Sequence, residues 1–338
     1  MNGQQSSRNK AQQLDGWWQG EWTRLLRGNV YLLAFMAAIV GLLFLGRDQL
    51  PSSTLIIWGL TFGGTTAVAI LLVSLYRVQI ELKESRHQLA RKAAELNFAR
   101  EVQIALFPTK FPDDTGLCFA AVCRPAQGIS GDFYDIFRCP DGRTVVALAD
   151  VSGKGVSAAL LMANLQARLR VHAERSANLS EVCYTLNNDL YAVTESSKFA
   201  TAFVAQWSPE KRRLDYVNAG HSTPVFIGSG VNGDLSCGGM PFGLFPGVDY
   251  ESGSVELDAS DVLVVYSDGI TEAADSNGEE FGAGRLTEVV KSVQEESIRD
   301  IRESILRAVE QWSGQEQDDD MTLVVVKVDE QKSKGSSS

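Results

Sequence analysis

Apolar residues are arranged in two different ways along this chain. In the N-terminal part, residues 28–46 and 50–76 form two long runs without a charged side chain. Each run is long enough to cross a hydrocarbon core of about 30 Å as a helix. Beyond residue 112, short apolar runs alternate with amphipathic stretches and Gly-containing turns, which is typical of a mixed α/β domain. The pattern therefore predicts a membrane segment followed by a globular unit.

The two uncharged runs predict a transmembrane hairpin over residues 28–76, with both ends in the cytoplasm. Lys and Arg precede the first run and follow the second, whereas the connecting loop holds one Arg balanced by one Asp. Because basic residues stay on the cytoplasmic side, we expect a multi-pass protein of the cytoplasmic membrane. A cleaved signal peptide is the alternative for the first run, disfavoured by its length and by the second run. In residues 1–27, Trp18 and Trp22 have the spacing of a short interfacial helix.

Residues 77–108 predict a helical linker between the membrane and the globular unit. No Gly or Pro precedes Pro108 in this segment, and leucines recur every seven residues, although Arg86 and Arg100 interrupt the seam. The heptads predict a short parallel coiled coil, and hence a homodimer formed through this helix. The alternative is a single amphipathic helix that packs on its own globular unit. The seam leucines are Leu75, Leu82, Leu89 and Leu96.

The region 109–328 predicts a mixture of strands and helices. Several strand candidates are continuous apolar runs, which favours strands buried on both faces or in a core between two sheets. Residues 329–338 form a polar tail that we expect to be disordered. The predicted strands are 145–151, 200–207, 213–218, 224–227, 262–267 and 322–328. The predicted helices are 157–173, 180–194, 283–295 and 297–312.

Charge and composition narrow the chemistry. The formal net charge of -11 disfavours a nucleic-acid partner, because a phosphate backbone needs a basic face. The five cysteines show no zinc-ligand or redox spacing, and their odd number argues against a disulfide framework. With three histidines in the chain, a zinc site built from His and Cys is disfavoured. Oxygen ligands favour harder ions, so Mg²⁺ or Mn²⁺ is the expected metal.

Four short acidic clusters lie far apart in the chain, each at the edge of an apolar strand. Carboxylates at strand ends can point into a shared cleft, where they repel one another unless cations lie between them. The simplest arrangement is a site for two divalent metals. Most Asp-Gly pairs are turns, but a buried strand leads directly into Asp268. The clusters are Gly131–Asp135, Asp150–Gly155, Ser267–Gly269 and Asp318–Thr322.

Together with several further motifs, these clusters resemble the metal-dependent protein phosphatases (PPM), in particular the SpoIIE-like branch found in bacteria. The match runs from about Ala99 to Val328. The resemblance implies an α/β fold of the PPM type, an α-β-β-α sandwich, for residues 109–328. Besides the acidic clusters, the match includes Asn218–His221, Gly239–Gly243, Phe281–Gly282 and, at the entry to the domain, Ala99–Gln103 and Leu106–Pro108.

The resemblance also implies a catalytic site with two Mn²⁺ or Mg²⁺ ions. In that site Asp150 bridges the two ions, and the carbonyl group of Val151 helps to hold one of them. Asp132 serves the same ion, partly through water, while Asp268 and Asp319 complete the other. Water attacks phosphorus directly in this mechanism, so no Ser or Cys nucleophile is needed.

Several neighbouring residues have open assignments. Asp318 and Asp320 are adjacent competitors for the role of Asp319. Ser152 stands where the eukaryotic branch has a His that is a candidate general acid. His221 either replaces that acid or belongs to a turn that shapes the core. Two residues are either phosphate contacts or solvated surface residues, namely Arg124 and Lys154.

The resemblance implies a phosphatase that acts on phosphoserine or phosphothreonine of a small STAS-domain regulator of the anti-anti-sigma type. With the predicted topology, the enzyme is membrane-anchored and its catalytic domain lies in the cytoplasm. A catalytically silent binding scaffold on the same fold is one alternative, disfavoured because all four aspartates are retained. A two-metal nuclease is the second alternative, disfavoured by the acidic net charge.

Overall fold

The computed structural model describes residues 34–35, 37–42, 44–45, 51–126, 128–194, 198–228, 234–259, 261–314 and 317–328. The chain divides into two compact units, Met1–Leu89 and Ala90–Ser338. The predicted interfacial helix in residues 1–27 and the predicted disordered tail lie outside the described residues.

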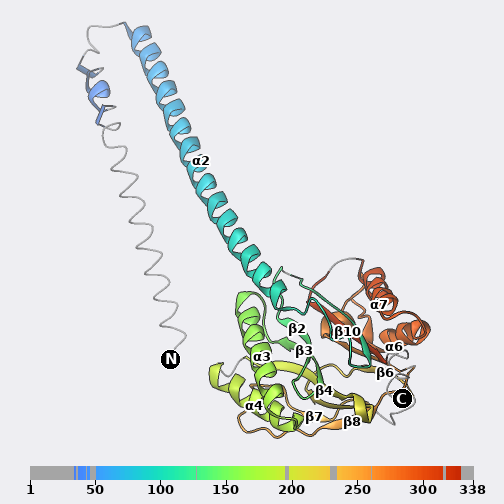
Figure 1. Ribbon diagram of the computed structural model, residues 1–338. Helices are drawn as coiled ribbons and strands as arrows, with labels where there is room; N and C mark the ends of the chain where they lie inside the picture. Colours follow the sequence, from blue (N-terminus) through green and yellow to red (C-terminus); the bar gives the residue numbers. More distant parts are fainter. Residues whose placement is uncertain are drawn as a thin grey trace, which may run out of the picture. The chain divides into compact units, whose positions relative to one another are not determined.

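Before the sheets, the chain forms one long helix, α2 (Ser52–Leu106), drawn in Figure 1 as an unbroken ribbon. This helix carries the second uncharged run and the linker sequence without interruption. Among the described residues, α2 alone is long and apolar enough to cross a membrane, with a mean hydropathy of 2.0 in its apolar window. The first uncharged run is described only in part, as short helical stretches between residues 34 and 45. A second membrane-spanning helix, and with it the multi-pass topology, is therefore not supported by the described residues.

The second unit contains two β-sheets packed face to face. The first sheet has four strands in the order β1-β10-β9-β6, all antiparallel. The second has the order β2-β3-β4-β5-β7, and β8 also pairs with β5. The strands of the first sheet are β1 (Leu117–Arg124), β6 (Val225–Ile227), β9 (Val262–Tyr266) and β10 (Met321–Val328). Those of the second are β2 (Asp132–Arg138), β3 (Thr144–Val151), β4 (Ala200–Ser208), β5 (Arg213–Ala219), β7 (Gly238–Gly239) and β8 (Gly253–Glu256).

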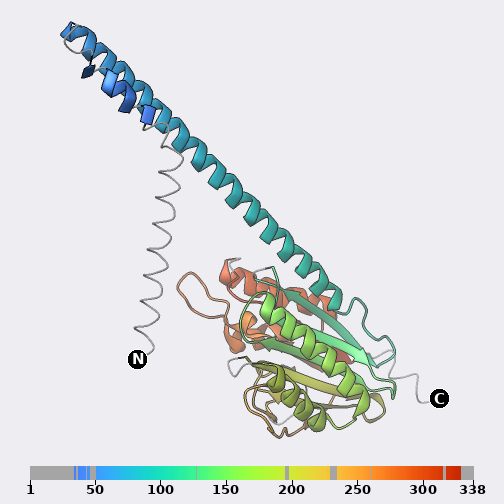
Figure 2. The same cartoon turned by 90° about the vertical axis from the view of Figure 1, so that its left-hand side faces the viewer.

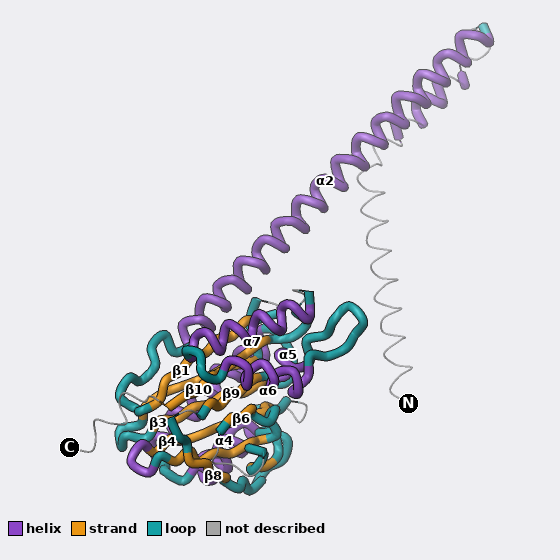
Figure 3. Tube along the Cα trace, turned by 90° about the vertical axis from the view of Figure 1, so that its right-hand side faces the viewer, coloured by secondary structure: helices purple, strands orange, loops and turns teal. Residues whose placement is uncertain are grey.

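Helices cover the outer face of each sheet. Figure 2 shows α3 and α4 side by side over the β2–β5 sheet, and Figure 3 shows α6 and α7 over the opposite sheet. The apolar side chains form three layers, one between the sheets and one under each helix pair. The expected α-β-β-α sandwich is confirmed. The helices are α3 (Val156–Arg175), α4 (Leu179–Val193), the short α5 (Asp268–Thr271), α6 (Gly282–Val293) and α7 (Ile298–Ser313); a 3-10 turn, η1, spans Pro209–Lys211.

Local sequence explains where the outer helices begin and end. The side chain of Asn178 accepts hydrogen bonds from the backbone N–H groups of Ser180 and Glu181, which caps the start of α4. Ser297 caps α7 in the same way through the N–H of Asp300. Gly314 ends α7 in the left-handed conformation, which a residue without a Cβ adopts at little cost. All six predicted strands and all four predicted helices are present, with ends shifted by one or two residues.

Candidate active site

Two of the predicted site residues face each other across neighbouring strands. In the antiparallel pair β2–β3, Asp132 lies directly opposite Asp150. The backbone approaches closely here, because a Cβ added to Gly131 would lie 2.8 Å from the carbonyl oxygen of Val151. A side chain at position 131 would therefore push the two strand ends apart. The register of β2 and β3 thus brings both carboxylates and the Val151 carbonyl to one edge of the sheet.

The other two site residues come from the opposite sheet, at the end of β9 and just before β10. The N–H of Ser267 donates to the carbonyl of Thr322 at 2.9 Å, and the Ser267 hydroxyl donates to the carbonyl of Asp320 at 3.0 Å. These bonds hold Asp268, the first residue of α5, beside the turn that contains Asp319. A Cβ at Gly269 would lie 2.2 Å from the Asp320 carbonyl oxygen, so this contact requires glycine.

The electrostatics show that the four carboxylates share one region. Burial and repulsion by Asp150 raise the pKa of Asp132 well above its usual range. Burial and repulsion by Asp268 raise the pKa of Asp150 to about 6. Burial and repulsion by Asp319 raise the pKa of Asp268. Residues from both sheets therefore disfavour one another's charge, as the sequence predicted for convergent carboxylates.

The donor set fits a pair of hard divalent ions. Asp132 is 1% exposed, and its Oδ2 atom has no hydrogen-bond partner among the described residues, so a buried acceptor is left unsatisfied. The other donors are the carboxylates of Asp150, Asp268 and Asp319, and carboxylate oxygens are the ligands that Mg²⁺ and Mn²⁺ prefer. As they stand, no three His, Cys, Asp or Glu side chains among the described residues are close enough together to form a complete metal cluster.

Hydrogen bonding separates the three consecutive aspartates before β10. Both carboxylate oxygens of Asp320 are occupied, since they accept the backbone N–H groups of Ala126 and Gly131 at 2.8 Å each. Asp320 therefore fastens the loop before β2 to the start of β10. Asp318 contributes its carbonyl oxygen to the Lys154 ammonium group at 2.9 Å, and its side chain is exposed. This pattern leaves Asp319 as the candidate ligand of the three.

Two basic or acidic side chains near the site have structural partners. Asp135 is fully buried and accepts two hydrogen bonds of 2.7 Å from the guanidinium group of Arg170, so it anchors β2 to α3. Arg124 forms a partly exposed ion pair with Glu310 of α7, a contact that neither the phosphate role nor the solvated-surface alternative included.

Ser152, which stands where the eukaryotic branch has a His, and His221, the candidate general acid, are both held by contacts within the protein. Ser152 accepts a hydrogen bond from the N–H of Phe199 at 2.9 Å. His221 is buried, and its Nδ1 atom lies 2.8 Å from the Thr201 hydroxyl. Burial lowers the pKa of His221 to about 4, so its ring is neutral near pH 7 and carries no extra proton to donate. The arrangement favours the core-turn alternative for His221.

One contact next to the candidate site, between Gln103 and Ser130, was not expected from the sequence. Gln103, near the end of α2, is 4% exposed, and its amide group makes two hydrogen bonds with the backbone of Ser130, at 2.6 and 2.9 Å. The Ser130 hydroxyl in turn accepts the N–H of Asp132 at 2.9 Å. A signal was present, because Gln103 occupies the next heptad position after Leu96. A polar residue at that position marks the point where the seam enters the catalytic unit.

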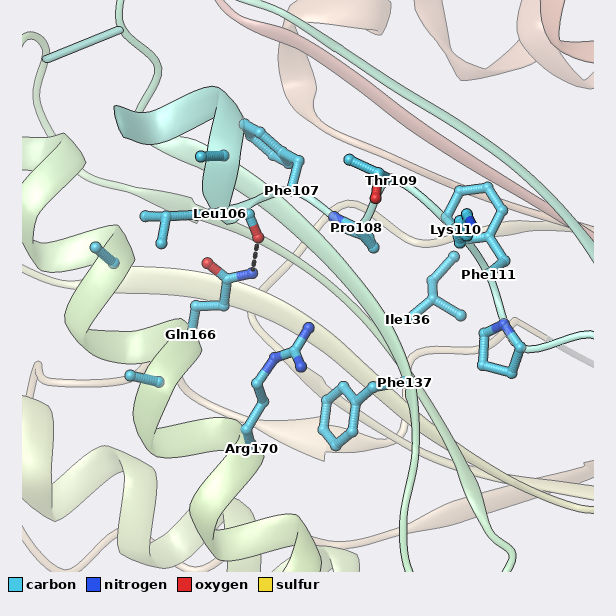
Figure 4. Close-up of a pocket in the computed structure, with 14 residues that line it drawn as sticks. Leu106, Phe107, Pro108, Thr109, Lys110, Phe111, Ile136, Phe137, Gln166 and Arg170 are labelled. Atoms are coloured by element: carbon cyan, nitrogen blue, oxygen red, sulfur yellow. Dashed lines mark hydrogen bonds between the residues drawn. The ribbon is translucent and has the colours of Figure 1, made fainter. Parts of the chain in front are cut away.

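A groove lies beside this junction. Its volume is about 690 Å³, and its walls come from the end of α2, the segment after it, β2 and α3. Figure 4 shows the side chain of Gln166 donating to the carbonyl of Leu106, at 3.0 Å. Phe107 packs on Tyr134 with ring centroids 5.1 Å apart. The end of α2 is therefore attached both to β2, which carries Asp132, and to α3, which follows the Asp150 turn.

Comparison with known proteins agrees with this geometry. The family model described as Stage II sporulation protein E (SpoIIE) matches residues 140–329. Phosphoserine phosphatase RsbU of Bacillus subtilis is 30% identical over 239 residues, which cover 69% of this chain and 70% of RsbU. Protein IcfG of Synechocystis sp. is also 30% identical, over 265 residues, but the match covers only 41% of IcfG.

A solved structure supports the fold independently. The SiaA-PP2C domain of Pseudomonas aeruginosa superimposes with a TM-score of 0.62, over 71% of this chain and 98% of that domain. The two sequences are 17% identical, so this likeness speaks for the architecture of the two sheets and their helices and not for a shared substrate.

Proposed function

The chain belongs to the SpoIIE family, whose catalytic domain is a PP2C-type serine/threonine protein phosphatase, and we propose that it acts on a phosphorylated regulatory protein of a partner-switching pathway. The observation that carries this proposal is the pairing of Asp132 with Asp150 at one sheet edge, beside Asp268 and Asp319 from the other sheet. The expected substrate is phosphoserine or phosphothreonine on a STAS-domain protein of the anti-anti-sigma type.

The proposed ligand set is Asp132, Asp150, the Val151 carbonyl, Asp268 and Asp319. Two Mn²⁺ or Mg²⁺ ions held there would supply an activated water and would offset the negative charge of the transferring phosphoryl group. The protein's part is to keep the carboxylates in place before substrate arrives. The strand register fixes Asp132 and Asp150. The Ser267–Asp320 hydrogen bond joins the ends of β9 and β10, and the Gly131–Asp320 hydrogen bond ties that sheet to the start of β2.

Membrane attachment is the second element of the proposal. The apolar part of α2 is exposed along its length and carries no charged residue before Arg77, which suits a lipid environment. We expect the preceding uncharged run to complete a hairpin, with the catalytic unit in the cytoplasm. Reporter fusions test this: one fused after Val328 should behave as cytoplasmic, and one near Pro51 as external. The opposite pattern would exclude a cytoplasmic phosphoprotein as the substrate.

An assay with two substrates tests the function directly. The purified full-length protein should release phosphate from a phosphoserine STAS-domain protein when Mn²⁺ is present and should not cleave DNA. Asp150→Asn should abolish the release, because it removes the bridging carboxylate. Binding of the phosphoprotein without any turnover in the wild type would favour the silent scaffold, and metal-dependent DNA cleavage would favour the nuclease.

A further inference from the structure

Lys154 forms an ion pair with one of the candidate metal ligands, Asp319. Its ammonium group lies 3.1 Å from Oδ2 of Asp319 and 2.9 Å from the carbonyl oxygen of Asp318. Among the described ion pairs, this one alone involves any of the four site aspartates. The residue belongs to the turn that directly follows Asp150 and Val151, so it comes from the same sequence cluster as the proposed bridging ligand.

Two glycines shape the backbone of the turn that carries Lys154. Gly153 and Gly155 flank it, with φ angles of 100° and 79°, in the region that favours glycine. Lys154 thus lies in a turn directly after β3, and its side chain reaches Asp319 just before β10 of the opposite sheet. The contact joins the second acidic cluster of the chain to the fourth.

The Lys154 contact and a metal ion at Asp319 exclude each other. Oδ1 of Asp319 already accepts the backbone N–H of Asp320 at 2.8 Å, so Oδ2 is the oxygen that an ion would take. An ammonium group at hydrogen-bond distance from that oxygen would repel a divalent cation bound to it. The Lys154 side chain is 49% exposed, and its four-carbon stem allows it to swing into solvent when an ion arrives.

We infer that Lys154 is a built-in counter-ion, which neutralises Asp319 in the metal-free site and competes with the divalent ion for the Asp268/Asp319 position. The inference rests on the proposed two-metal function, and it concerns the affinity of one of the two positions. Metal entry at that position carries the extra cost of displacing Lys154. The Asp132/Asp150 position has no such competitor among the described residues. The two ions should therefore bind with different affinities, and Lys154 sets the weaker one.

Lys198, just before β4, provides a matched control because it contacts the same turn. Its ammonium group donates to the carbonyl oxygen of Ser152 at 3.3 Å, and it forms no ion pair among the described residues. Replacing either lysine with Gln removes one positive charge close to the site. Only Lys154→Gln also frees the Asp319 carboxylate. The difference between the two variants therefore isolates direct competition from the general effect of net charge.

The experiment is a calorimetric titration of Mn²⁺ into metal-free full-length protein in detergent, with Lys154→Gln, Lys198→Gln and Lys154→Arg beside the wild type. We expect Lys154→Gln to tighten the weaker binding step by about twofold to fivefold more than Lys198→Gln does, as for an exposed ion pair. Lys154→Arg keeps the charge and should stay close to the wild type. The advantage of Lys154→Gln should shrink in about 1 M salt, because exposed charges are screened.

Equal affinities in Lys154→Gln and Lys198→Gln, or weaker binding in Lys154→Gln, would overturn the inference. Failure of the proposed function has a different signature. In that case the wild type itself would bind no Mn²⁺, and Asp150→Asn would leave the titration unchanged.

Discussion

The two halves of the candidate site are built differently. Asp132 and Asp150 lie on adjacent strands of one sheet, in direct register, and Asp132 is buried. Asp268 and Asp319 lie outside the strands of the other sheet, and the side chain of Asp319 is 42% exposed and paired with Lys154. The first half is held by strand pairing and by the end of α2, whereas the second is held by turns. The comparison indicates one half that strand pairing fixes in place and a second half whose Asp319 side chain is open to solvent and to the Lys154 cation.

The largest expected difference lies in catalysis. Asp150→Asn should lower the phosphatase rate by about 10³-fold or more, because Asp150 is the proposed ligand of both ions. Asp319→Asn should cost less, about 10- to 100-fold, and excess Mn²⁺ should recover part of it. Steady-state rates over a range of Mn²⁺ concentrations measure both. If both variants lose the same factor in phosphatase rate and Mn²⁺ restores neither, the two halves of the site do not differ in the way proposed.

The second prediction concerns the connection between α2 and the Asp132/Asp150 half of the site. In a fragment of residues 77–338, replacing Arg86 and Arg100 with Leu should strengthen dimerisation and shift the rate, because both residues interrupt the heptad seam. Adding Gln103→Ala should remove the effect on rate while leaving dimerisation intact, since Gln103 links the helix to Ser130 and Asp132.

The measurements are phosphatase rate and sedimentation of the parent fragment, the double-Leu variant, Gln103→Ala and their combination. A rate shift that survives Gln103→Ala would show that the signal travels by another route. If the double-Leu fragment stays monomeric and its phosphatase rate is unchanged, the linker helix only connects the two units and does not regulate activity.

The third prediction is a pH dependence of the metal-free protein. Because folding raises the pKa of Asp150 to about 6, the folded state favours its protonated form. That contribution is complete at low pH and is lost as the pH rises through about 6. Above pH 6, the free energy of unfolding of Asp150→Asn should therefore exceed that of the wild type by about 1–3 kcal/mol. The difference should vanish near pH 4, and denaturant unfolding at several pH values measures it. A difference that is constant with pH would mean that the variant acts through packing.

The smallest expected effect is that of Asp318→Asn. The carboxylate of Asp318 is exposed, and the structure uses only its carbonyl oxygen, which the substitution retains. Phosphatase rate and stability should stay within about twofold and about 0.5 kcal/mol of the wild type. A loss of rate as large as that of Asp319→Asn would show that the choice of Asp319 over Asp318 as the metal ligand is wrong.

The strands with a continuous apolar sequence could be predicted from the sequence. It could also be predicted which acidic clusters lie near one another. β2 could not be predicted, because its two aspartates suggest a polar loop, although Asp132 and Asp135 are both buried. Burial of Asp135 depends on Arg170, which lies 35 residues away in the sequence, and no local pattern contains that pairing. The resemblance favoured Asp319 as the ligand, but the sequence itself did not separate it from its neighbour Asp320. Only the contacts of Asp320 with Ala126 and Gly131 assign it a structural role.

The most direct test of the account is the number of Mn²⁺ ions that the metal-free full-length protein binds. The account predicts two ions per chain for the wild type, and weakened binding of both in Asp150→Asn, because that carboxylate is shared. Asp320→Asn should still bind two ions, since both oxygens of Asp320 serve the backbone. Two ions bound to Asp150→Asn with wild-type affinity would contradict the central claim that the two sheets form one site around this residue.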